Sequence, residues 1–238
     1  MKSIFLILFS VIACVLNAQT ATEKVTWDYP VRYGTPEWET LNTFQERLNA
    51  FNIPDEIIKN ISTEELVKVC LSYPWWGLID AYNDRRTGFG IIVGYFNGFR
   101  ELFRRTDAAT QLLKEYDKMD PLAVDPEWTD LQKGLYCFQF EKIEMFLSKK
   151  PMIRQLDEEG VRRLTETVLS KYQKKRMLPE IYSLYNLSPT VAVCLNIIEK
   201  ENSELLNNRY DVNMFRNTVM SNDIRFLDAM VELLKKKD

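Results

Sequence analysis

The sequence predicts an all-α fold, an irregular multi-helix array or superhelical bundle of about nine to eleven helices. Three observations support this class. Apolar residues recur at three- and four-residue spacing through most of the 238-residue chain. Helix-capping residues or prolines precede these stretches. Strand-type alternation is limited to short pieces such as residues 24–31, which are too few to build a sheet.

Capping signals place the helices in the first half of the chain. Thr35, Pro36 and Glu37 provide a cap, a first-turn proline and a first-turn acid. Ser62 and Glu65 have the spacing of a capping box. Together with the apolar spacing, these signals predict helices over residues 35–51, 55–60, 62–73, 75–82 and 90–105, a polar loop over residues 83–88, and a helix that Asp107 caps.

The second half begins with the same type of signal. Asp125, Pro126 and Glu127 start a helix that we expect to be the longest of the chain, and it ends near Ser148 because Pro151 follows. Acidic first turns and later prolines place further helices over residues 157–178, 179–187 and 190–200, helical turns over residues 202–210, and a last helix from residue 222.

Residues 1–18 have the organisation of a secretory signal peptide. Lys2 precedes an apolar run over residues 4–15, and the small residue Ala18 ends the leader. The run is shorter than the roughly 20 residues that cross a membrane. We therefore expect cleavage near Ala18, no membrane span, and an extracytoplasmic protein that is periplasmic, secreted or exposed at the cell surface.

A lipid anchor is the alternative explanation of this leader. Residues 11–14 read Val-Ile-Ala-Cys and resemble a bacterial lipobox, in which case Cys14 would be acylated. Otherwise Cys14 is a small apolar residue of the leader. Behind the leader, the polar and aromatic residues 19–34 are expected to form an extended arm. Residues 35–238 contain no linker composition, so we expect a single helical domain there.

The composition excludes several kinds of chemistry. The chain has no histidine, which excludes histidine-dependent nucleophiles, general bases and metal sites. It has 31 basic and 34 acidic residues, and this mild acidity argues against nucleic acid as a partner. We expect no metal and no cofactor. Cys70, Cys137 and Cys194 lie among apolar residues, and the sequence leaves open whether two of them form a disulfide.

Residues 71–107 contain five of the eight glycines of the chain. Gly90, Gly94 and Gly98 are four residues apart and fall on one stripe of the expected helix. Three glycines cost a helix roughly 2–3 kcal/mol relative to alanine. We therefore expect another helix to approach this stripe closely. Exposure of the backbone to a ligand is the alternative.

The candidate ligand site lies just before this stripe. Tryptophans and charged residues are close together there, an arrangement that suits a sugar or an acidic ligand; the candidates are Trp75, Trp76, Asp80, Asp84, Arg85 and Arg86. The alternative is a buried tryptophan pair beside a solvated turn. No catalytic residue and no metal ligand is assigned.

Two further groups of charges are predicted to be structural. Glu141 and Glu144 are three residues apart on the longest expected helix, where lysines nearby are ordinary surface partners. We expect both carboxylates on the surface, with an acid–base pair as the alternative. The basic run of Lys171, Lys174, Lys175 and Arg176 is expected at a helix end, with a docking patch as the alternative.

Four segments of the chain together resemble a group of functionally uncharacterised secreted proteins of Bacteroides-type gut bacteria. These segments are WDYPV at residues 27–31, GTPEW at 34–38, Ile53-Pro54 with STEEL at 62–66, and FNGFREL at 96–102. The resemblance covers roughly the first half of the mature chain. It implies export and a helical fold, and it implies no activity or catalytic residue.

The function predicted from these observations is binding. We expect a non-enzymatic, exported binding or interaction module whose partner is a protein or a glycan. The alternative is a carboxylate-dependent hydrolase that acts on a glycan or a cell-wall polymer. That enzyme would need two carboxylates about 5–10 Å apart across a cleft.

Overall fold

The computed structural model describes residues 24–207 and 209–236. This part of the chain contains thirteen α-helices, two 3₁₀ helices and no strand, which confirms the all-α prediction. The expected count of about nine to eleven helices is slightly low, because two of the predicted helices divide in two and the helices Lys150–Gln155 and Tyr210–Thr218 are not predicted. The predicted leader over residues 1–18, with Cys14, lies outside the described residues.

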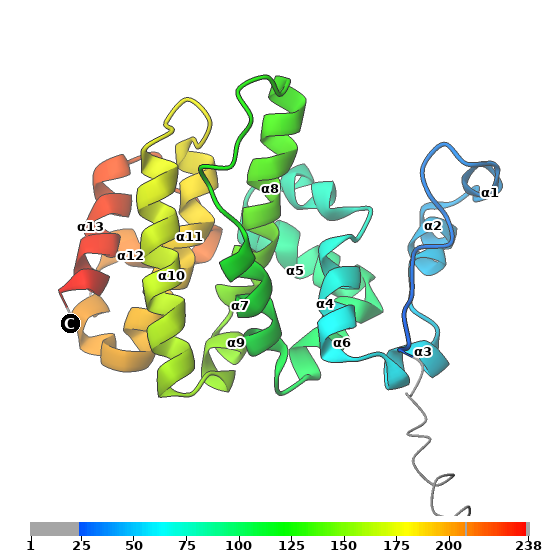
Figure 1. Ribbon diagram of the computed structural model, residues 1–238, viewed down its shortest axis with the longest axis horizontal. Coiled ribbons are helices and arrows are strands. Elements are labelled where there is room, and N and C mark those ends of the chain that lie inside the picture. The colour runs from blue at the N-terminus through cyan, green and yellow to red at the C-terminus, as the bar shows by residue number, and fades with distance from the viewer. Residues whose placement is uncertain (1–23, 208, 237–238) are drawn as a thin grey trace, which may run out of the picture.

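The first half of the chain folds as a series of short helices at one end of the molecule (Figure 1). Its elements are α1 (Pro36–Glu39), α2 (Phe44–Ala50), α3 (Asp55–Asn60), α4 (Thr63–Leu71), the 3₁₀ helix η2 (Trp76–Ala81), α5 (Arg85–Tyr95) and α6 (Asn97–Arg104). The segment before α1 is neither helix nor strand from residue 24 onward. Tyr29 holds it against the body, because its ring is buried and its hydroxyl donates to the Val69 carbonyl at 2.9 Å.

The second half supplies the longer helices, which lie side by side in Figure 1. They are α7 (Ala108–Lys118), α8 (Asp130–Leu147), α9 (Lys150–Gln155), α10 (Glu158–Arg176), α11 (Leu184–Asn202), the 3₁₀ helix η3 (Ser203–Leu206), α12 (Tyr210–Thr218) and α13 (Ile224–Lys235). α11 is the central helix, since it packs against α8, α10 and α13.

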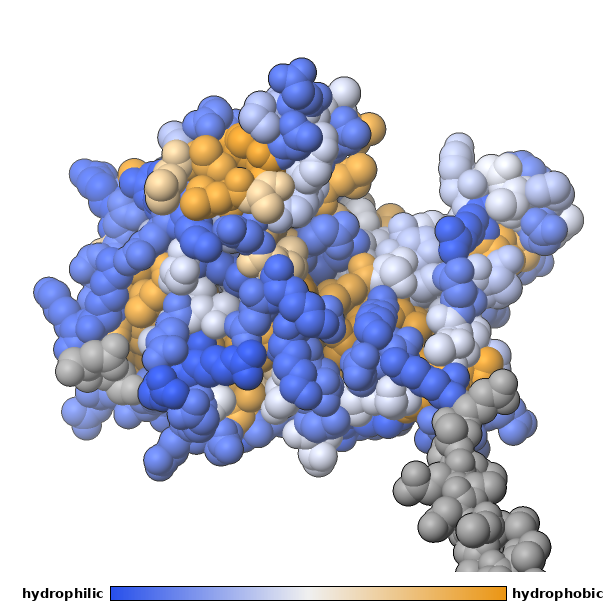
Figure 2. Space-filling view, in the orientation of Figure 1, coloured by the Kyte–Doolittle hydropathy of each residue, from blue (hydrophilic) through white to orange (hydrophobic). Residues whose placement is uncertain are grey.

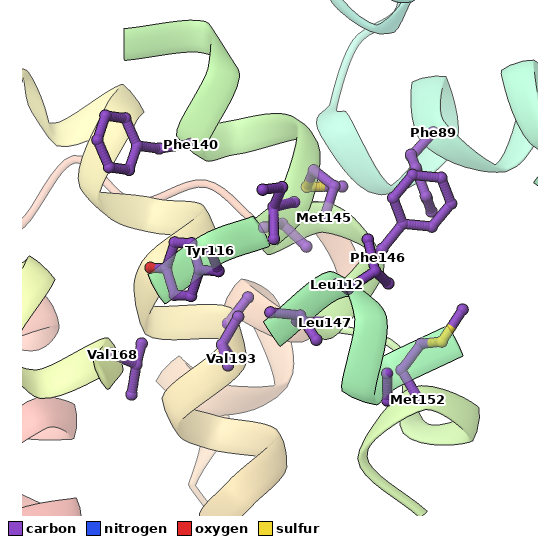
Figure 3. Packing of buried hydrophobic residues seen from close by; sticks show 14 of the residues in the cluster. Phe89, Leu112, Tyr116, Phe140, Met145, Phe146, Leu147, Met152, Val168 and Val193 are labelled. Carbon is purple, nitrogen blue, oxygen red and sulfur yellow. The ribbon is translucent and has the colours of Figure 1, made fainter. Parts of the chain in front are cut away.

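Aromatic side chains join the two halves into one core. Phe146 of α8 lies 5.2 Å, between ring centroids, from both Phe89 and Phe99, and 5.7 Å from Trp76. Figure 3 shows Phe89 facing Phe146 across the interface. All four rings are buried. Edge-on ring pairs of this kind stabilise a fold by about 0.5–1.5 kcal/mol beyond the area they bury.

The three cysteines are buried in this core. Cys70, Cys137 and Cys194 are free thiols, so no disulfide joins any two of them. The sequence leaves this point open. Burial raises the pKa of each thiol above its ordinary value. These cysteines therefore behave as small apolar side chains rather than as nucleophiles.

The prediction of one helix over residues 35–51 is wrong, because the chain breaks between α1 and α2. The Thr43 hydroxyl accepts a hydrogen bond from the Glu46 amide at 3.1 Å. The Glu46 carboxylate in turn accepts one from the Thr43 amide at 2.9 Å. This reciprocal capping box begins a new helix at Phe44. The apolar spacing continues through the break, so it gave no sign of it.

The predicted loop over residues 83–88 is also wrong, because α5 begins inside it. The Asp84 carboxylate accepts hydrogen bonds from the Thr87 amide at 2.8 Å and from the Thr87 hydroxyl at 2.9 Å. An aspartate that caps in this way satisfies the open amides of a first helical turn. The helix therefore starts at Arg85, well before the apolar spacing becomes regular.

The predicted helix over residues 90–105 is two helices with a break at Phe96. Phe96 has extended backbone angles, φ −111° and ψ 123°. The side chain of Asn97 fixes the break, since its oxygen accepts from the Ile53 amide at 2.9 Å and its amide donates to the Ile53 carbonyl at 2.8 Å. These bonds tie α6 to the link between α2 and α3.

The break also overturns most of the predicted glycine stripe. A Cβ atom at Gly90 or Gly94 would meet no atom within 4 Å beyond its immediate surroundings, so no helix packs closely there. Gly98 does lie against side chains, since a Cβ there would lie 2.4 Å from the Phe96 ring and 3.1 Å from Ile53. The closest backbone approach is at Gly88, where a Cβ would lie 2.1 Å from the Ile79 carbonyl oxygen.

The helix expected from residue 125 begins later, at Asp130. Thr129 and Gln132 form a reciprocal capping box there, and residues 125–128 form a turn. α8 has 18 residues, whereas α10 and α11 have 19 each. The prediction that this helix is the longest is therefore wrong by a small margin.

Near the C-terminus the structure merges two predicted helices and adds one. α11 runs without a break through Pro189, where the sequence predicts separate helices over residues 179–187 and 190–200. The predicted helical turns over residues 202–210 are in part the short η3, and α12 then follows as a further helix. The sequence does not predict α12, which carries few regularly spaced apolar residues.

The surface in Figure 2 is mostly hydrophilic with several apolar areas, one of which lies over the loop after α7 and the link between α10 and α11. No helix in the described part of the chain is both long and apolar enough to span a membrane. This agrees with the prediction that the mature chain has no membrane-spanning helix.

Candidate functional site

The structure places the six candidate ligand-site residues in different surroundings. Trp75 is half-buried and stacks on Phe44 with 5.2 Å between ring centroids. Trp76 is buried, and its indole nitrogen donates to the Cys70 carbonyl at 2.8 Å. Asp84 caps α5. These three side chains are therefore occupied by packing and capping, and the six do not form one exposed cluster.

Arg85 is buried and joins α5 to α8 and α11. It pairs with the Glu141 carboxylate at 2.7 Å, and only 1% of the Arg85 side chain and 2% of the Glu141 side chain are exposed. The guanidinium also lies 3.1 Å from the centre of the Tyr185 ring. The Tyr185 hydroxyl donates to Asp80. Asp80 and Arg85 therefore belong to a network between helices.

This network also explains why α11 continues through a proline. Pro189 has no amide hydrogen, so the carbonyl four residues earlier, that of Tyr185, lacks its helical donor. Arg85 donates a hydrogen bond to the Tyr185 carbonyl instead. A side chain from α5 thus replaces the backbone hydrogen bond that the proline removes, and the helix stays intact.

The prediction that Glu141 and Glu144 lie on the surface is wrong. α5, α7, α10 and α11 surround their part of α8, and both carboxylates are buried. Glu144 accepts hydrogen bonds from Lys175 at 2.8 and 3.0 Å, from the Tyr116 hydroxyl at 2.6 Å and from Thr190 at 2.9 Å. Lys175 comes from the basic run at the end of α10, so that run is partly internal.

Glu141 is less completely satisfied. One of its oxygens, Oε1, is buried without a hydrogen-bond partner among the described residues. Burial raises the pKa of Glu141 to about 7, and the nearby Arg85 guanidinium opposes the rise. A raised carboxyl pKa is common at acid–base sites. Glu141, however, is sealed between helices and lines none of the four main cavities of the described chain.

A cavity of about 500 Å³ lies where α5, α9, α11 and α12 meet at the end of α8. Basic residues dominate its charged lining, and asparagines supply much of the remaining polar surface. The side chains that bear on its chemistry are Arg86, Lys149, Lys150, Arg216, Glu199, Asn196, Asn213 and Asn217. Of the predicted candidates, only Arg86 lines this cavity.

Four cations thus face one carboxylate in this cavity. Glu199 pairs with Lys150 at 2.6 Å and with Arg216 at 3.1 Å. Arg86 donates to the Arg216 carbonyl at 2.8 Å. The Nε atom of Arg216 is buried without a partner in the described part of the chain. A single shared carboxylate leaves most of this positive charge uncompensated.

Lys149 occupies the wall between α8 and α9. Its ammonium lies 4.8 Å from the centre of the buried Phe89 ring. Burial and, to a smaller extent, the Arg86 charge together lower the pKa of Lys149 to about 8, and Asp84 opposes the shift. Cation–ring contact compensates only part of the lost hydration. The charged form of Lys149 is therefore destabilised on the wall of a cationic cavity.

The backbone of the cavity rim is strained at one residue. Val219, which follows α12 and lines the cavity, has φ 57° and ψ 38°. This left-handed conformation suits glycine and is costly for a β-branched residue. Such strain persists where the surrounding packing holds it, and it is frequent at functional sites.

Sequence reasoning missed this cavity because its charges come from four separate places in the chain. Residues 149–151 are predicted only as a helix stop, and α12, which supplies Arg216, is not predicted at all. No matching protein family is found for the chain, and no curated protein or solved structure is significantly similar to it.

Proposed function

We propose that the protein is an exported binding module that captures an anionic ligand in the cavity between α5, α9, α11 and α12. The observation that supports this function best is the charge of the lining, four cations against the single carboxylate of Glu199. Export is proposed from the leader over residues 1–18.

A bound anion would reduce the repulsion between the cations of this cavity and would supply hydrogen-bond acceptors to its unpaired polar atoms. Like charges that line one concave surface repel one another, and low-dielectric walls strengthen the field between them. Buried polar atoms without partners, such as the Nε of Arg216, cost about 1–3 kcal/mol each. A carboxylate, sulfate or phosphate group supplies both the negative charge and the hydrogen-bond acceptors, and guanidinium groups recognise all three.

The asparagines suggest a ligand that carries hydroxyl groups beside its charge. Asn196, Asn213 and Asn217 line the same cavity, and a carboxamide both donates and accepts hydrogen bonds. Phe215 adds an aromatic surface to the lining. An acidic sugar combines these features, so it is the ligand class we favour.

A carboxylate-dependent hydrolase is the alternative function, and it has less support. It needs two carboxylates on opposite sides of a bound glycan, whereas the cationic cavity contains only Glu199. Glu141 and Glu144 lie three residues apart on α8, but each is buried against a basic partner. For these reasons we propose binding rather than hydrolysis.

Calorimetric titration of the mature chain tests this function. The probes are glucuronate, glucose 6-sulfate and glucose 6-phosphate, with glucose as the neutral control. We expect one or more acidic sugars to bind and glucose not to bind, with an affinity that weakens as ionic strength rises.

A pair of variants ties this result to the cavity. Arg86→Gln should weaken binding of the acidic sugars by about tenfold, because one exposed cation of the lining is removed. Lys59→Gln removes one charge from α3, which contributes no residue to the cavity, and it should leave the affinity unchanged. Equal effects of the two variants, or no preference for acidic sugars over glucose, would refute the proposal.

A further inference from the structure

Two neighbouring lysines of the cavity differ in their partners. Lys150 is exposed and pairs with Glu199 at 2.6 Å. The Lys149 side chain is half-buried, and its amine lies over the Phe89 ring without a hydrogen bond or ion pair to the residues that the structure describes. A carboxylate therefore contacts the ammonium of Lys150, whereas no carboxylate of the described residues contacts the amine of Lys149.

The surroundings of Lys149 favour its neutral, nucleophilic form. Burial beside the Phe89 ring, 4.8 Å away, removes water from the amine, and the Arg86 cation acts on it from α5. The attraction between the ring and an ammonium offsets only part of this lost hydration. Asp84 is the one acid that opposes these effects, and its carboxylate is already engaged in capping α5. An amine desolvated beside another cation is the arrangement by which proteins activate lysine as a nucleophile toward carbonyl groups.

We infer that Lys149 forms a reversible imine with an anionic aldehyde or ketone held in the cavity. This inference rests on the proposed function, because the cationic lining must first bind the anionic group of the ligand. It narrows the ligand class to molecules that carry both a carbonyl group and a carboxylate, sulfate or phosphate. Open-chain forms of acidic sugars and keto acids have this combination.

The chemistry of this step is balanced without a further reactant. The nitrogen lone pair of neutral Lys149 attacks the carbonyl carbon, and the C=O double bond becomes a hydroxyl group that takes a proton from the attacking nitrogen. The hydroxyl then leaves as water with one solvent proton, and a protonated C=N bond forms. No oxidation or reduction occurs, and hydrolysis of the imine regenerates the amine.

Pyridoxal 5′-phosphate is a suitable probe, because it carries an aldehyde and a phosphate group. The mature protein is incubated with the probe, reduced with borohydride to fix any imine, and digested for peptide mass spectrometry. We expect Lys149 to carry at least tenfold more label than Lys150. Pyridoxal, which lacks the phosphate, should label Lys149 at least fivefold less, and inorganic phosphate should protect it.

The neighbouring lysine serves as an internal control in the folded wild-type protein, and Lys149→Arg, which keeps the positive charge but has no nucleophilic amine, should lose the labelling. Equal labelling of Lys149 and Lys150, or labelling of Lys149 that phosphate does not reduce, would overturn the inference. If acidic sugars bind but Lys149 stays unlabelled, only the imine inference fails. If neither binding nor labelling is seen, the proposed function fails as well.

Discussion

The Glu144 carboxylate joins four helices. It lies on α8 and accepts hydrogen bonds from Tyr116 of α7, Lys175 of α10 and Thr190 of α11. Lys175 and Glu144 are 1% and 0% exposed. Removal of one partner from a buried ion pair leaves an uncompensated charge in the core, which is more damaging than loss of an exposed pair.

Lys175→Met should therefore lower the free energy of unfolding by about 3–5 kcal/mol. Urea denaturation of the purified variant measures this loss. Lys174→Met is the matched control, because Lys174 is the preceding residue and pairs with Asp120 at 3.0 Å near the surface. Its loss should stay below about 1 kcal/mol. Equal losses for the two variants would mean that the buried pair does not stabilise the fold.

At the scale of elements, the glycines of α5 allow a direct comparison. Gly88 faces the Ile79 carbonyl of η2, and a Cβ there would lie 2.1 Å from that oxygen. Gly90 lies two residues further along the same helix and is exposed. A Cβ at Gly90 would have no neighbouring atom within 4 Å beyond its immediate surroundings. α5 therefore needs a glycine at the first position but not at the second.

Gly88→Ala should destabilise the protein by about 1–3 kcal/mol, because either helix must shift to admit the methyl group. Gly90→Ala should stabilise it by about 0.5–1 kcal/mol through helix propensity alone. Thermal and urea unfolding of both variants measure these changes. A Gly88→Ala variant as stable as wild type would contradict the described contact between α5 and η2, and a Gly90→Ala variant less stable than wild type would contradict the open surroundings of Gly90.

Local chemistry made most elements predictable. α3, α4, α7, α10 and α13 lie close to their expected positions, because their capping residues, acidic first turns or breakers act within a few residues. The merged helix α11 was not predictable in this way. Pro189 predicts a break in the helix. The helix continues because Arg85, from a distant part of the chain, donates a hydrogen bond to the Tyr185 carbonyl, and the local sequence does not show this contact.

The candidate site was less predictable than the fold for the same reason. Arg86 was identified from local composition, since charged residues cluster around it. Lys149, Glu199 and Arg216 become neighbours only when α9, α11 and α12 pack together. The burial of Glu141 and Glu144 likewise depends on the helices around α8, and the spacing of two carboxylates along one helix does not reveal it.

At the scale of the whole molecule, the cations of the fold are paired unevenly. Arg85 and Lys175, buried in the helical body, each have a dedicated carboxylate, whereas the buried Lys142 and Lys171 donate to backbone carbonyls. In the cavity, Lys150 and Arg216 share Glu199, and Arg86 and Lys149 line the same surface. Four cations around one carboxylate on a concave surface support a role in ligand binding.

Removal of the Glu199 carboxylate tests the proposed anion site most directly. Its carboxylate competes with a bound anion for Lys150 and Arg216. Glu199→Gln should therefore tighten the binding of an acidic sugar or of inorganic phosphate by about tenfold, because two cations lose a competing charge. Glu127→Gln, which removes an exposed acid outside the cavity, is the control with the same change in net charge.

Calorimetric titration of the two variants and the wild-type chain with the same anion is the deciding measurement. We expect tighter binding for Glu199→Gln and wild-type affinity for Glu127→Gln. Weaker or unchanged binding for Glu199→Gln, in a variant that circular dichroism shows to be folded, would contradict the claim that this cavity is an anion site.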